Sequence, residues 1–282
     1  VHWPFEENHW GGWTVGGFNL EHPQYWCRRA DGTPFWGRAS ISFPQVVQHK
    51  LDLVDELMDR GVEVLFIDTW RMGNWNLGDE YVEPMKKRFR ERYGEAPSSD
   101  HADPRWVETA CEFSLRFFRK LREHTRKRDS NFQIMVGIPY AAPFNDKHKK
   151  RSGIDWQKLV EAELVDTLVV NSVSWDKAAP EPSTRKLYGD IMTFVDGRCR
   201  VLFPVSAYNF SSNAYGLGSY EKSMGIPQHE AAANLMHWAR DAGGHGVSLE
   251  CVDYGNYREQ TRKTMEQLAK TFDGQARQEK RQ

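Results

Sequence analysis

The sequence predicts an α/β protein: a parallel (β/α) barrel of the TIM type, in which the first strands are absent or irregular. Short apolar runs alternate with amphipathic helical segments from residue 41 onward, which is typical of a parallel sheet with helices outside it. These runs are apolar throughout, as expected of strands that are buried on both faces. The competing open, doubly wound sheet usually carries a glycine-rich phosphate loop, but the glycines of residues 11–17 lack the GxGxxG spacing.

The first complete unit is predicted from its cap and its periodicity. Ser42 can cap a helix that has Pro44 in its first turn, and apolar residues then recur at helical spacing from Val47 to Leu57. The run VEVLFID at 62–68 predicts a buried strand. Asp103 and Pro104 then open a long helix.

The same alternation continues to the end of the chain. Further strands are expected at 132–140, 166–173, 199–208 and 246–250, and helices at 156–164 after Asp155, at 184–195 after Ser183, at 227–242, and after Asn256. Residues 41–273 are therefore expected to hold the barrel units, and residues 274–282 a polar tail. Residues 1–40 are expected to be irregular with one strand near 13–20.

This gives five strands and one weaker one, whereas a closed barrel has eight. Because the last helix follows the last strand, the missing units are expected upstream. The chain begins at Val1 and not at Met, which predicts a processed or truncated N-terminus. Localisation stays open, with a secreted or periplasmic protein as one alternative, and so does the oligomeric state.

Composition excludes several partners. The 38 basic and 39 acidic residues nearly cancel, so there is no electrostatic case for nucleic acid or an anionic membrane. No run approaches the ~18 apolar residues that suggest a membrane span. The four cysteines form no CxxC pair and are predicted to be small buried hydrophobes.

Catalytic groups of such barrels lie at the carboxyl ends of strands. Asp68 ends the first confident strand and Glu250 the last. No histidine ends a confident strand, and no HExxH, Walker or dinucleotide motif occurs, so neither metal nor cofactor is expected. Two carboxyl groups suit the hydrolysis of a glycosidic bond. We expect Asp68 to act as nucleophile or base and Glu250 as general acid.

Amides, hydroxyls, charges and indoles close to the strand ends suit a sugar, whose hydroxyls need polar partners and whose apolar faces stack on aromatic rings. The expected substrate-binding residues are Trp70, Arg71, Trp75, Tyr140, Asn171, Trp175, Asp176, Tyr208 and Asp253. A structural interpretation stands beside each. Asp68 can form an ion pair at the barrel rim, the tryptophans can pack in the core, and the loop acids can simply be solvated.

The segment 43–75 resembles bacterial family-10-like glycosyl hydrolases, which are glycosidase-like TIM barrels. Their helix opens near PEV, matched here by Pro44 and Val46, and their strand ends in LDFxR, matched by Ile67-Asp68-Thr69-Trp70-Arg71. FRERYGEAP and DPRWVETACEFSLRFFRKLRE resemble later segments of the same proteins, so that roughly residues 22–128 are covered. The family's Asp-Gly before this strand is replaced by Glu63-Val64.

The resemblance implies that Asp68 is the catalytic carboxylate and that Arg71 is its neighbour; Glu250 rests on its position alone. The sequence therefore predicts a glycoside hydrolase acting on a poly- or oligosaccharide. A non-catalytic carbohydrate-binding barrel is the alternative, favoured by the missing Asp-Gly and the missing early strands. A lyase or isomerase that uses a metal with carboxylates is a third hypothesis.

Overall fold

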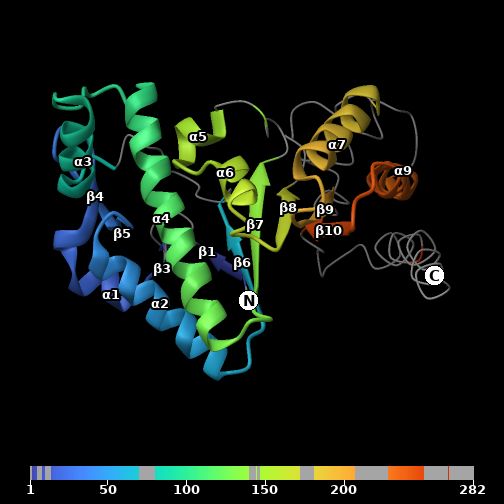
Figure 1. The fold of residues 1–282 in the computed structure, drawn as a ribbon, viewed down its shortest axis with the longest axis horizontal. Coiled ribbons are helices and arrows are strands. Elements are labelled where there is room, and N and C mark those ends of the chain that lie inside the picture. The colour runs from blue at the N-terminus through green and yellow to red at the C-terminus, as the bar shows by residue number, and fades with distance from the viewer. Residues whose placement is uncertain are drawn as a thin grey trace. The chain divides into compact units, whose positions relative to one another are not determined.

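The computed structural model describes residues 2–4, 8–9, 14–69, 80–139, 144, 147–171, 181–206, 228–250 and 266. The chain divides into two compact units. The first consists of Val1–Gly137 and Phe144–Asp166, and the second of Ile138–Pro143 and Thr167–Gln282. The elements of both are drawn in Figure 1.

The sheet of the first unit is parallel. β6 (Val64–Asp68) pairs with β1 (His2–Pro4) on one side and with β7 (Gln133–Pro139) on the other. Pro4, Asp68 and Gly137 stand next to one another in register, near the carboxyl ends of the three strands. Apolar residues such as Leu65 and Ile67 are fully buried, which explains the continuously apolar run in the sequence.

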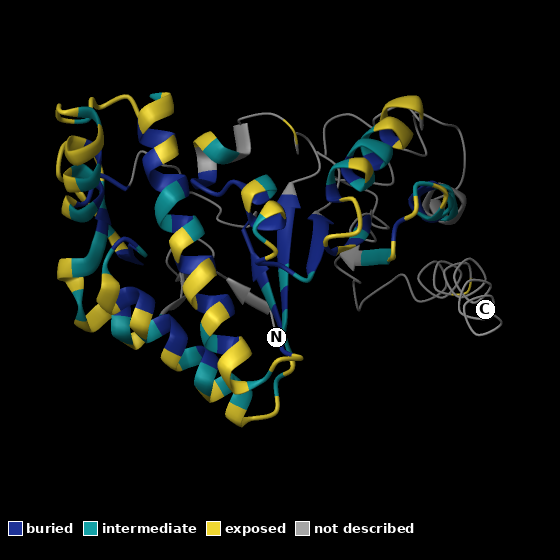
Figure 2. Cartoon of the chain, in the orientation of Figure 1, coloured by how far each residue is buried: buried dark blue, intermediate teal, exposed yellow. Residues whose placement is uncertain are grey.

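The first unit contains seven described helices: α1 (Gly17–Glu21), the 3₁₀ helix η1 (Pro23–Tyr25), α2 (Pro44–Asp59), α3 (Glu83–Tyr93), α4 (Pro104–Arg128), α5 (Lys147–Ser152) and α6 (Trp156–Glu161). Of these, α2, α3, α4 and α6 bury apolar residues. α4 buries Phe117, Phe118 and Leu121, and Figure 2 shows buried and exposed residues alternating along its turns. Such a stripe drives a helix against its neighbours, at about 2–3 kcal/mol for each fully buried large side chain.

Two of the expected helix caps are confirmed. Asp103 precedes α4 and accepts a hydrogen bond from the backbone N–H of Arg105 at 2.8 Å. Asp155 caps α6 by accepting from the N–H of Lys158. Because such a cap satisfies an orphan donor, each contributes about 1 kcal/mol.

Two other expected caps are wrong. The residue before α2 is Phe43, which has no capping side chain, and the Ser42 hydroxyl instead lies 2.8 Å from that of Ser40. Ser183 lies inside α7 (Glu181–Val195), because Pro182 allows the helix to begin earlier.

The strand expected near 13–20 is shorter than predicted. Among the described residues of this range, Thr14–Val15 is extended, as β3, which pairs antiparallel with β2 (Asn8–His9) outside the parallel sheet. Gly16 then caps α1, which occupies the rest of the range. The N-terminal region instead supplies β1 to the parallel sheet, and an antiparallel hairpin of β4 (Trp26–Arg28) and β5 (Pro34–Ala39).

The second unit is also built from parallel strands and helices. β8 (Thr167–Asn171), β9 (Arg200–Ser206) and β10 (Gly246–Glu250) are parallel in that order, with α7 and α9 (Gln228–Asp241) as their helices. Tyr188 and Phe203 stack at 4.0 Å between ring centroids in its core. β6 to β10 all fall within the ranges that the sequence predicts.

The fold class is confirmed as an α/β arrangement of parallel strands and helices. Each unit contributes three parallel strands, so six are present in the described part of the chain, against eight in a closed barrel. Cys27, Cys111 and Cys199 are buried free thiols, as expected, whereas Cys251 lies outside the described residues. None of the helices described is long and apolar enough to cross a membrane.

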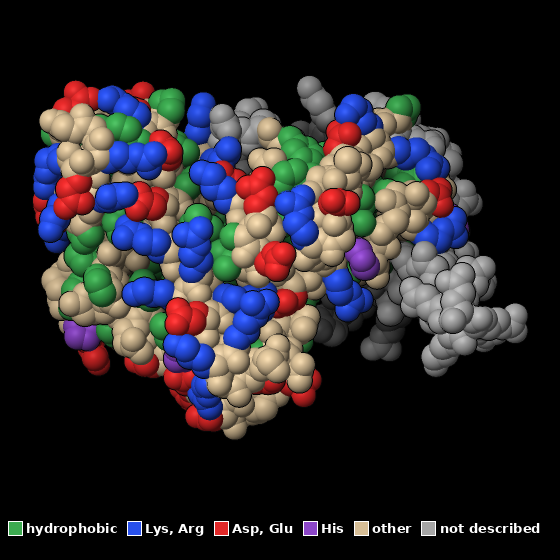
Figure 3. Space-filling view, viewed as in Figure 1, with side chains coloured by type: hydrophobic (Ala, Val, Ile, Leu, Met, Phe, Trp, Pro, Cys, Tyr) green, Lys and Arg blue, Asp and Glu red, His purple; other side chains and the backbone are tan. Residues whose placement is uncertain are grey.

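The visible surface carries mixed charge. Figure 3 shows Lys and Arg interspersed with Asp and Glu, in keeping with the near-zero net charge. Between α3 and α4 these charges pair, for example Arg88 with Glu112 at 3.0 Å and Arg92 with Glu108 at 2.6 Å. Exposed pairs of this kind contribute little each, about 0–1 kcal/mol.

Candidate active site

Asp68 is the last residue of β6, and it is buried. Only 5% of the residue is exposed, which is unusual for an aspartate. Successive side chains of a strand point to opposite faces, so Asp68 shares a face with Val64 and Phe66, opposite the fully buried Leu65 and Ile67. A carboxylate at this position is thus held at the carboxyl end of the sheet by the strand itself.

The residue beside Asp68 on β7 is a glycine. Asp68 is in register with Gly137, just as Phe66 is with Met135. Residues that pair in a parallel ladder share a face, so the position beside the Asp68 side chain has no Cβ. A glycine inside a strand often marks close approach by a ligand or by backbone. Sequence reasoning missed Gly137, although the glycine interrupting IMVGIPY was the available signal.

Thr69 fixes the direction in which the chain leaves β6. Thr69 is only 2% exposed, and its hydroxyl donates a hydrogen bond to the backbone carbonyl of Gly137. This bond ties the residue after Asp68 to the strand that provides the glycine. Asp68, Thr69 and Gly137 therefore form one compact cluster, which we call the β6–β7 corner.

The strand ends of the second unit present polar residues as predicted. β8 ends at Asn171, β9 at Ser206 and β10 at Glu250. Glu250 and Ser206 are in register as neighbours across the β9–β10 ladder. Of the predicted site residues, Asn171 and Glu250 are thus confirmed as strand ends of this unit.

The remaining predicted site residues lie outside the described part of the chain: Trp70, Arg71, Trp75, Tyr140, Trp175, Asp176, Tyr208 and Asp253.

A second buried acid, Glu80, was not predicted. It is 5% exposed, and both its oxygens accept hydrogen bonds, from the Cys27 thiol at 3.1 Å and from the Ser40 hydroxyl at 2.6 Å. The backbone of Glu80 also forms an isolated β-bridge with Arg28 of β4, in which the backbone N–H of Tyr81 donates to the Arg28 carbonyl. These contacts join the β4–β5 hairpin to the segment before α3, so the arrangement is that of a structural acid.

Tyr81 and Cys111 are buried groups that stay protonated. Loss of hydration raises the pKa of Tyr81 to about 12, with the charges of Asp100 and Asp103 adding to the effect. Burial raises the pKa of the Cys111 thiol to about 12 as well. Neither group can therefore serve as a base or nucleophile near neutral pH. Within the described residues, no three His, Cys, Asp or Glu side chains are grouped so as to hold a metal ion.

Comparison by sequence finds neither a matching family model nor a matching curated protein. Comparison by structure finds glycoside hydrolases. The chain is similar to the glycoside hydrolase domain of PgaB (BpsB) from Bordetella bronchiseptica, with a TM-score of 0.60 and 14% identity over 86% of this chain and 66% of that one. It is also similar to a family 42 β-galactosidase from G. stearothermophilus, with a TM-score of 0.58 and 10% identity over 94% of this chain and 46% of that one. A β-galactosidase from Bacillus circulans sp. alkalophilus is similar with a TM-score of 0.58 and 11% identity, over 90% of this chain and 44% of that one.

The chain thus spans between 44% and 66% of the lengths of these three proteins. At such low identity the likeness concerns the fold, which is that of glycosidase-like (β/α) barrels.

Proposed function

We propose that this chain is a glycoside hydrolase acting on a poly- or oligosaccharide, of the kind that its resemblance to family-10-like glycosyl hydrolases implies. The observation that carries the proposal is the β6–β7 corner: a buried carboxylate at a strand end, beside a position without a side chain. The fold supports it, because barrels of this class keep catalytic groups at the carboxyl ends of their strands.

Asp68 supplies one of the two carboxyl groups that glycoside hydrolysis requires, as nucleophile or as base. The second is Glu250, as general acid that protonates the leaving oxygen, since carboxyl ends of strands surround one mouth in a closed barrel. A separation of ~5–5.5 Å between the two carboxyl groups gives retention of configuration, and ~6.5–9.5 Å gives inversion.

Around these acids we propose a sugar-binding surface. Its indole and phenol rings would stack on apolar sugar faces, while its amide, guanidinium and acidic groups would bond hydroxyls. The residues are Trp70, Arg71, Trp75, Tyr140, Asn171, Trp175, Asp176, Tyr208 and Asp253.

Asp68→Asn tests the central claim. The substitution keeps the shape of the side chain but removes its negative charge, so hydrolysis should fall by about a thousandfold or more, with the circular dichroism spectrum unchanged. Activity is measured on a panel of neutral, acidic and aminated glycans, with and without a chelator. The matched control is Asp52→Asn, an exposed acid of α2 that accepts a hydrogen bond from Gln48 and should leave the rate unchanged.

Retained activity in Asp68→Asn would overturn the assignment. If the variant fails to fold, Asp68→Glu keeps the charge but displaces the carboxyl group, and full activity in that variant would count equally against it. Glycan binding by the wild type without any hydrolysis would favour the carbohydrate-binding alternative, and activity lost with the chelator would favour the metal-dependent lyase or isomerase.

Glu250→Gln tests the general acid. Without a proton donor, substrates with poor leaving groups should lose far more rate than activated aryl glycosides, which need little protonation. Equal losses on both classes would remove Glu250 from this role.

A further inference from the structure

A pocket of about 430 Å³ opens on the side of the first unit, between the C-terminal half of α4 and Leu164. Its lining is dominated by cations: Arg119, Arg122, Arg126 and Lys127, with Glu123 as the single acid. The Arg122 side chain reaches Asp166, which pairs with Ile134 near the start of β7. The pocket therefore lies toward the amino end of this strand, whereas the β6–β7 corner lies at Gly137, farther along it.

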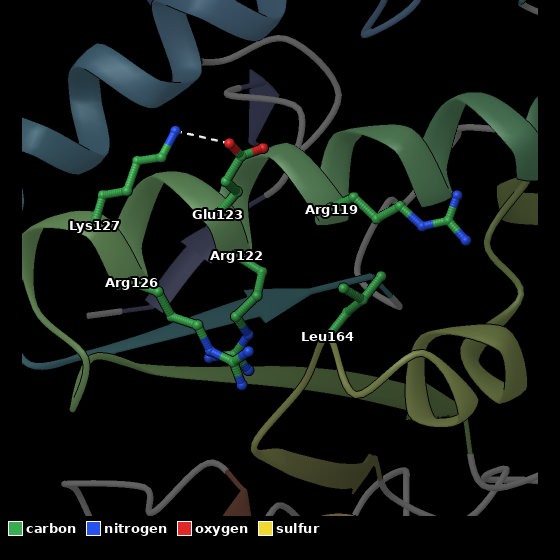
Figure 4. Close-up of a pocket in the computed structure, with 6 residues that line it drawn as sticks. All are labelled: Arg119, Arg122, Glu123, Arg126, Lys127 and Leu164. Carbon is green, nitrogen blue, oxygen red and sulfur yellow. Dashed lines mark hydrogen bonds and ion pairs between the residues drawn. The ribbon is translucent and has the colours of Figure 1, made fainter.

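The three arginines follow helical spacing. Arg119, Arg122 and Arg126 are three and four residues apart, which places them along one stripe of α4. Figure 4 shows Arg122 and Arg126 leaving the helix on the side where Leu164 lies and Glu123 and Lys127 on the other, while Arg119 extends along the helix away from Arg122 and Arg126. The stripe thus brings Arg122 and Arg126 to the side of Leu164, with Arg119 about one turn earlier along the helix.

Positive charge remains after the ion pairs are counted. Lys127 and Glu123 pair at 2.7 Å, and Arg122 pairs with Asp166 at 2.7 Å, so these charges offset one another. Among the described residues, no ion pair or hydrogen bond of a side chain engages Arg119 or Arg126. Two guanidinium charges at the pocket are therefore uncompensated.

Arg122 provides an independent sign of a missing partner. The residue is only 4% exposed, yet its Nε has no hydrogen-bond acceptor within the described part of the chain. Within the part of the chain that the structure describes, its side chain donates to Oδ2 of Asp166, and this oxygen also accepts from the backbone N–H of Ile134 at 2.6 Å. An unsatisfied buried donor destabilises the folded protein, so an anion that brings an acceptor to this side chain would be favourable.

We propose that this pocket binds a tetrahedral oxyanion, phosphate or sulfate, either free or as a substituent of a larger molecule. Guanidinium groups present paired N–H donors that match the oxygens of such anions, and charge-assisted bonds of this kind are stronger than neutral ones. The site is independent of the proposed hydrolysis, since it shares no residue with the β6–β7 corner.

Titration calorimetry with inorganic phosphate and inorganic sulfate, at ionic strength held constant with sodium chloride, tests the site. Wild-type protein should show saturable binding of one anion. Arg119→Ala and Arg126→Ala should each weaken it by about tenfold, the loss of one charge-assisted bond. Arg116→Ala is the matched control, because Arg116 is an exposed arginine of the same helix outside the pocket and should leave the affinity unchanged.

The two sources of the anion separate in a further arm. Glucose 6-phosphate should bind more tightly than inorganic phosphate if the natural ligand carries the group on a larger molecule, and no better if the ligand is free. Asp68→Asn should bind phosphate like the wild type, so failure of the hydrolase proposal would leave this test intact.

Three results would overturn the site. The first is the absence of saturable binding. The second is an equal loss in Arg116→Ala and Arg126→Ala, which would show diffuse attraction by the whole helix. The third is a poly-glutamate peptide that binds through Arg119 and Arg126 while phosphate fails to compete, because the pocket would then accept an acidic protein segment. Arg122 is left intact in all variants, because removing it would strand Asp166.

Discussion

The two ends of β7 each lie next to a charged side chain, and the surroundings of that side chain differ between them. At the amino end, Arg122 and Asp166 neutralise each other, and Asp166 and Ile134 exchange two backbone-anchored hydrogen bonds at 2.6 and 2.8 Å. At the carboxyl end, the acid Asp68 stands beside Gly137, which has no side chain. The first arrangement pairs an acid with a basic side chain, and the second places an acid beside a residue that has no side chain.

This difference predicts which substitutions in the first unit change stability and which change the rate of the proposed reaction. In barrels of this class the carboxyl end carries catalysis and the amino end carries stability. Substitutions at the Arg122–Asp166 pair should therefore act mainly on the free energy of unfolding, and substitutions at the β6–β7 corner mainly on the rate of the proposed hydrolysis.

Asp166→Ala should have the largest effect on stability. It removes the partner of a buried guanidinium and leaves that charge uncompensated, which costs about 3 kcal/mol. The free energy of unfolding, measured with urea, checks this value. Glu123→Ala is the control: Glu123 also pairs with a cation of α4, but both side chains are exposed, so its loss should cost less than about 1 kcal/mol. Equal costs for the two variants would erase the contrast between the ends of β7.

Gly137→Ala should have the opposite signature. The new methyl group would occupy the face that Asp68 shares, so kcat/KM should fall by about tenfold, equivalent to ~1.4 kcal/mol. Stability should hold or rise by up to about 1 kcal/mol, since alanine restricts the unfolded chain more than glycine does. Gly189→Ala, in α7 with open space around it, is the control for rate. A destabilised Gly137→Ala variant with normal kcat/KM would mean that the glycine serves packing alone.

The sequence predicts only part of this contrast. Asp68 was predicted because a continuously apolar run ends in an acid, and a run of that kind marks a strand buried on both faces. Gly137 was not predicted, because its place beside Asp68 depends on the register between two strands, and the two residues are 69 positions apart in the chain. Arg122 and Asp166 were missed for a similar reason: the pair is 44 residues apart in the chain and joins a helix to a strand end.

Local signals explain the errors in the fold as well. Ser42 and Ser183 have the residue type of a cap, but Phe43 precedes α2 without a capping side chain, and α7 already begins at Glu181 with Pro182 in its first turn. The strands of the β4–β5 hairpin are only three and six residues long, WCR and PFWGRA, and neither alternates apolar and polar residues, so no periodicity predicted the hairpin. The antiparallel pieces before α2 are held by tertiary contacts such as those of Glu80, which sequence spacing does not reveal.

The smallest expected effect concerns the start of α4, whose far end carries the Arg122–Asp166 pair. Hydrogen bonding by Arg105, and to a lesser degree the backbone N–H groups, lowers the pKa of Asp103 below its usual 3.8 despite some opposing loss of hydration. A lowered carboxyl pKa means that the cap stabilises the folded state fully above pH 3.8 and loses this contribution as the pH falls through the folded-state pKa.

Asp103→Ala should therefore cost about 1 kcal/mol at neutral pH, a third of the cost of Asp166→Ala. The difference between wild type and Asp103→Ala should shrink in urea titrations below pH 3.8. Asp103→Asn, which keeps a capping oxygen without the charge, should lose less at neutral pH and show no such trend of its own. A difference between wild type and Asp103→Ala that persists unchanged at low pH would show that the stability of this helix end does not depend on the ionised cap.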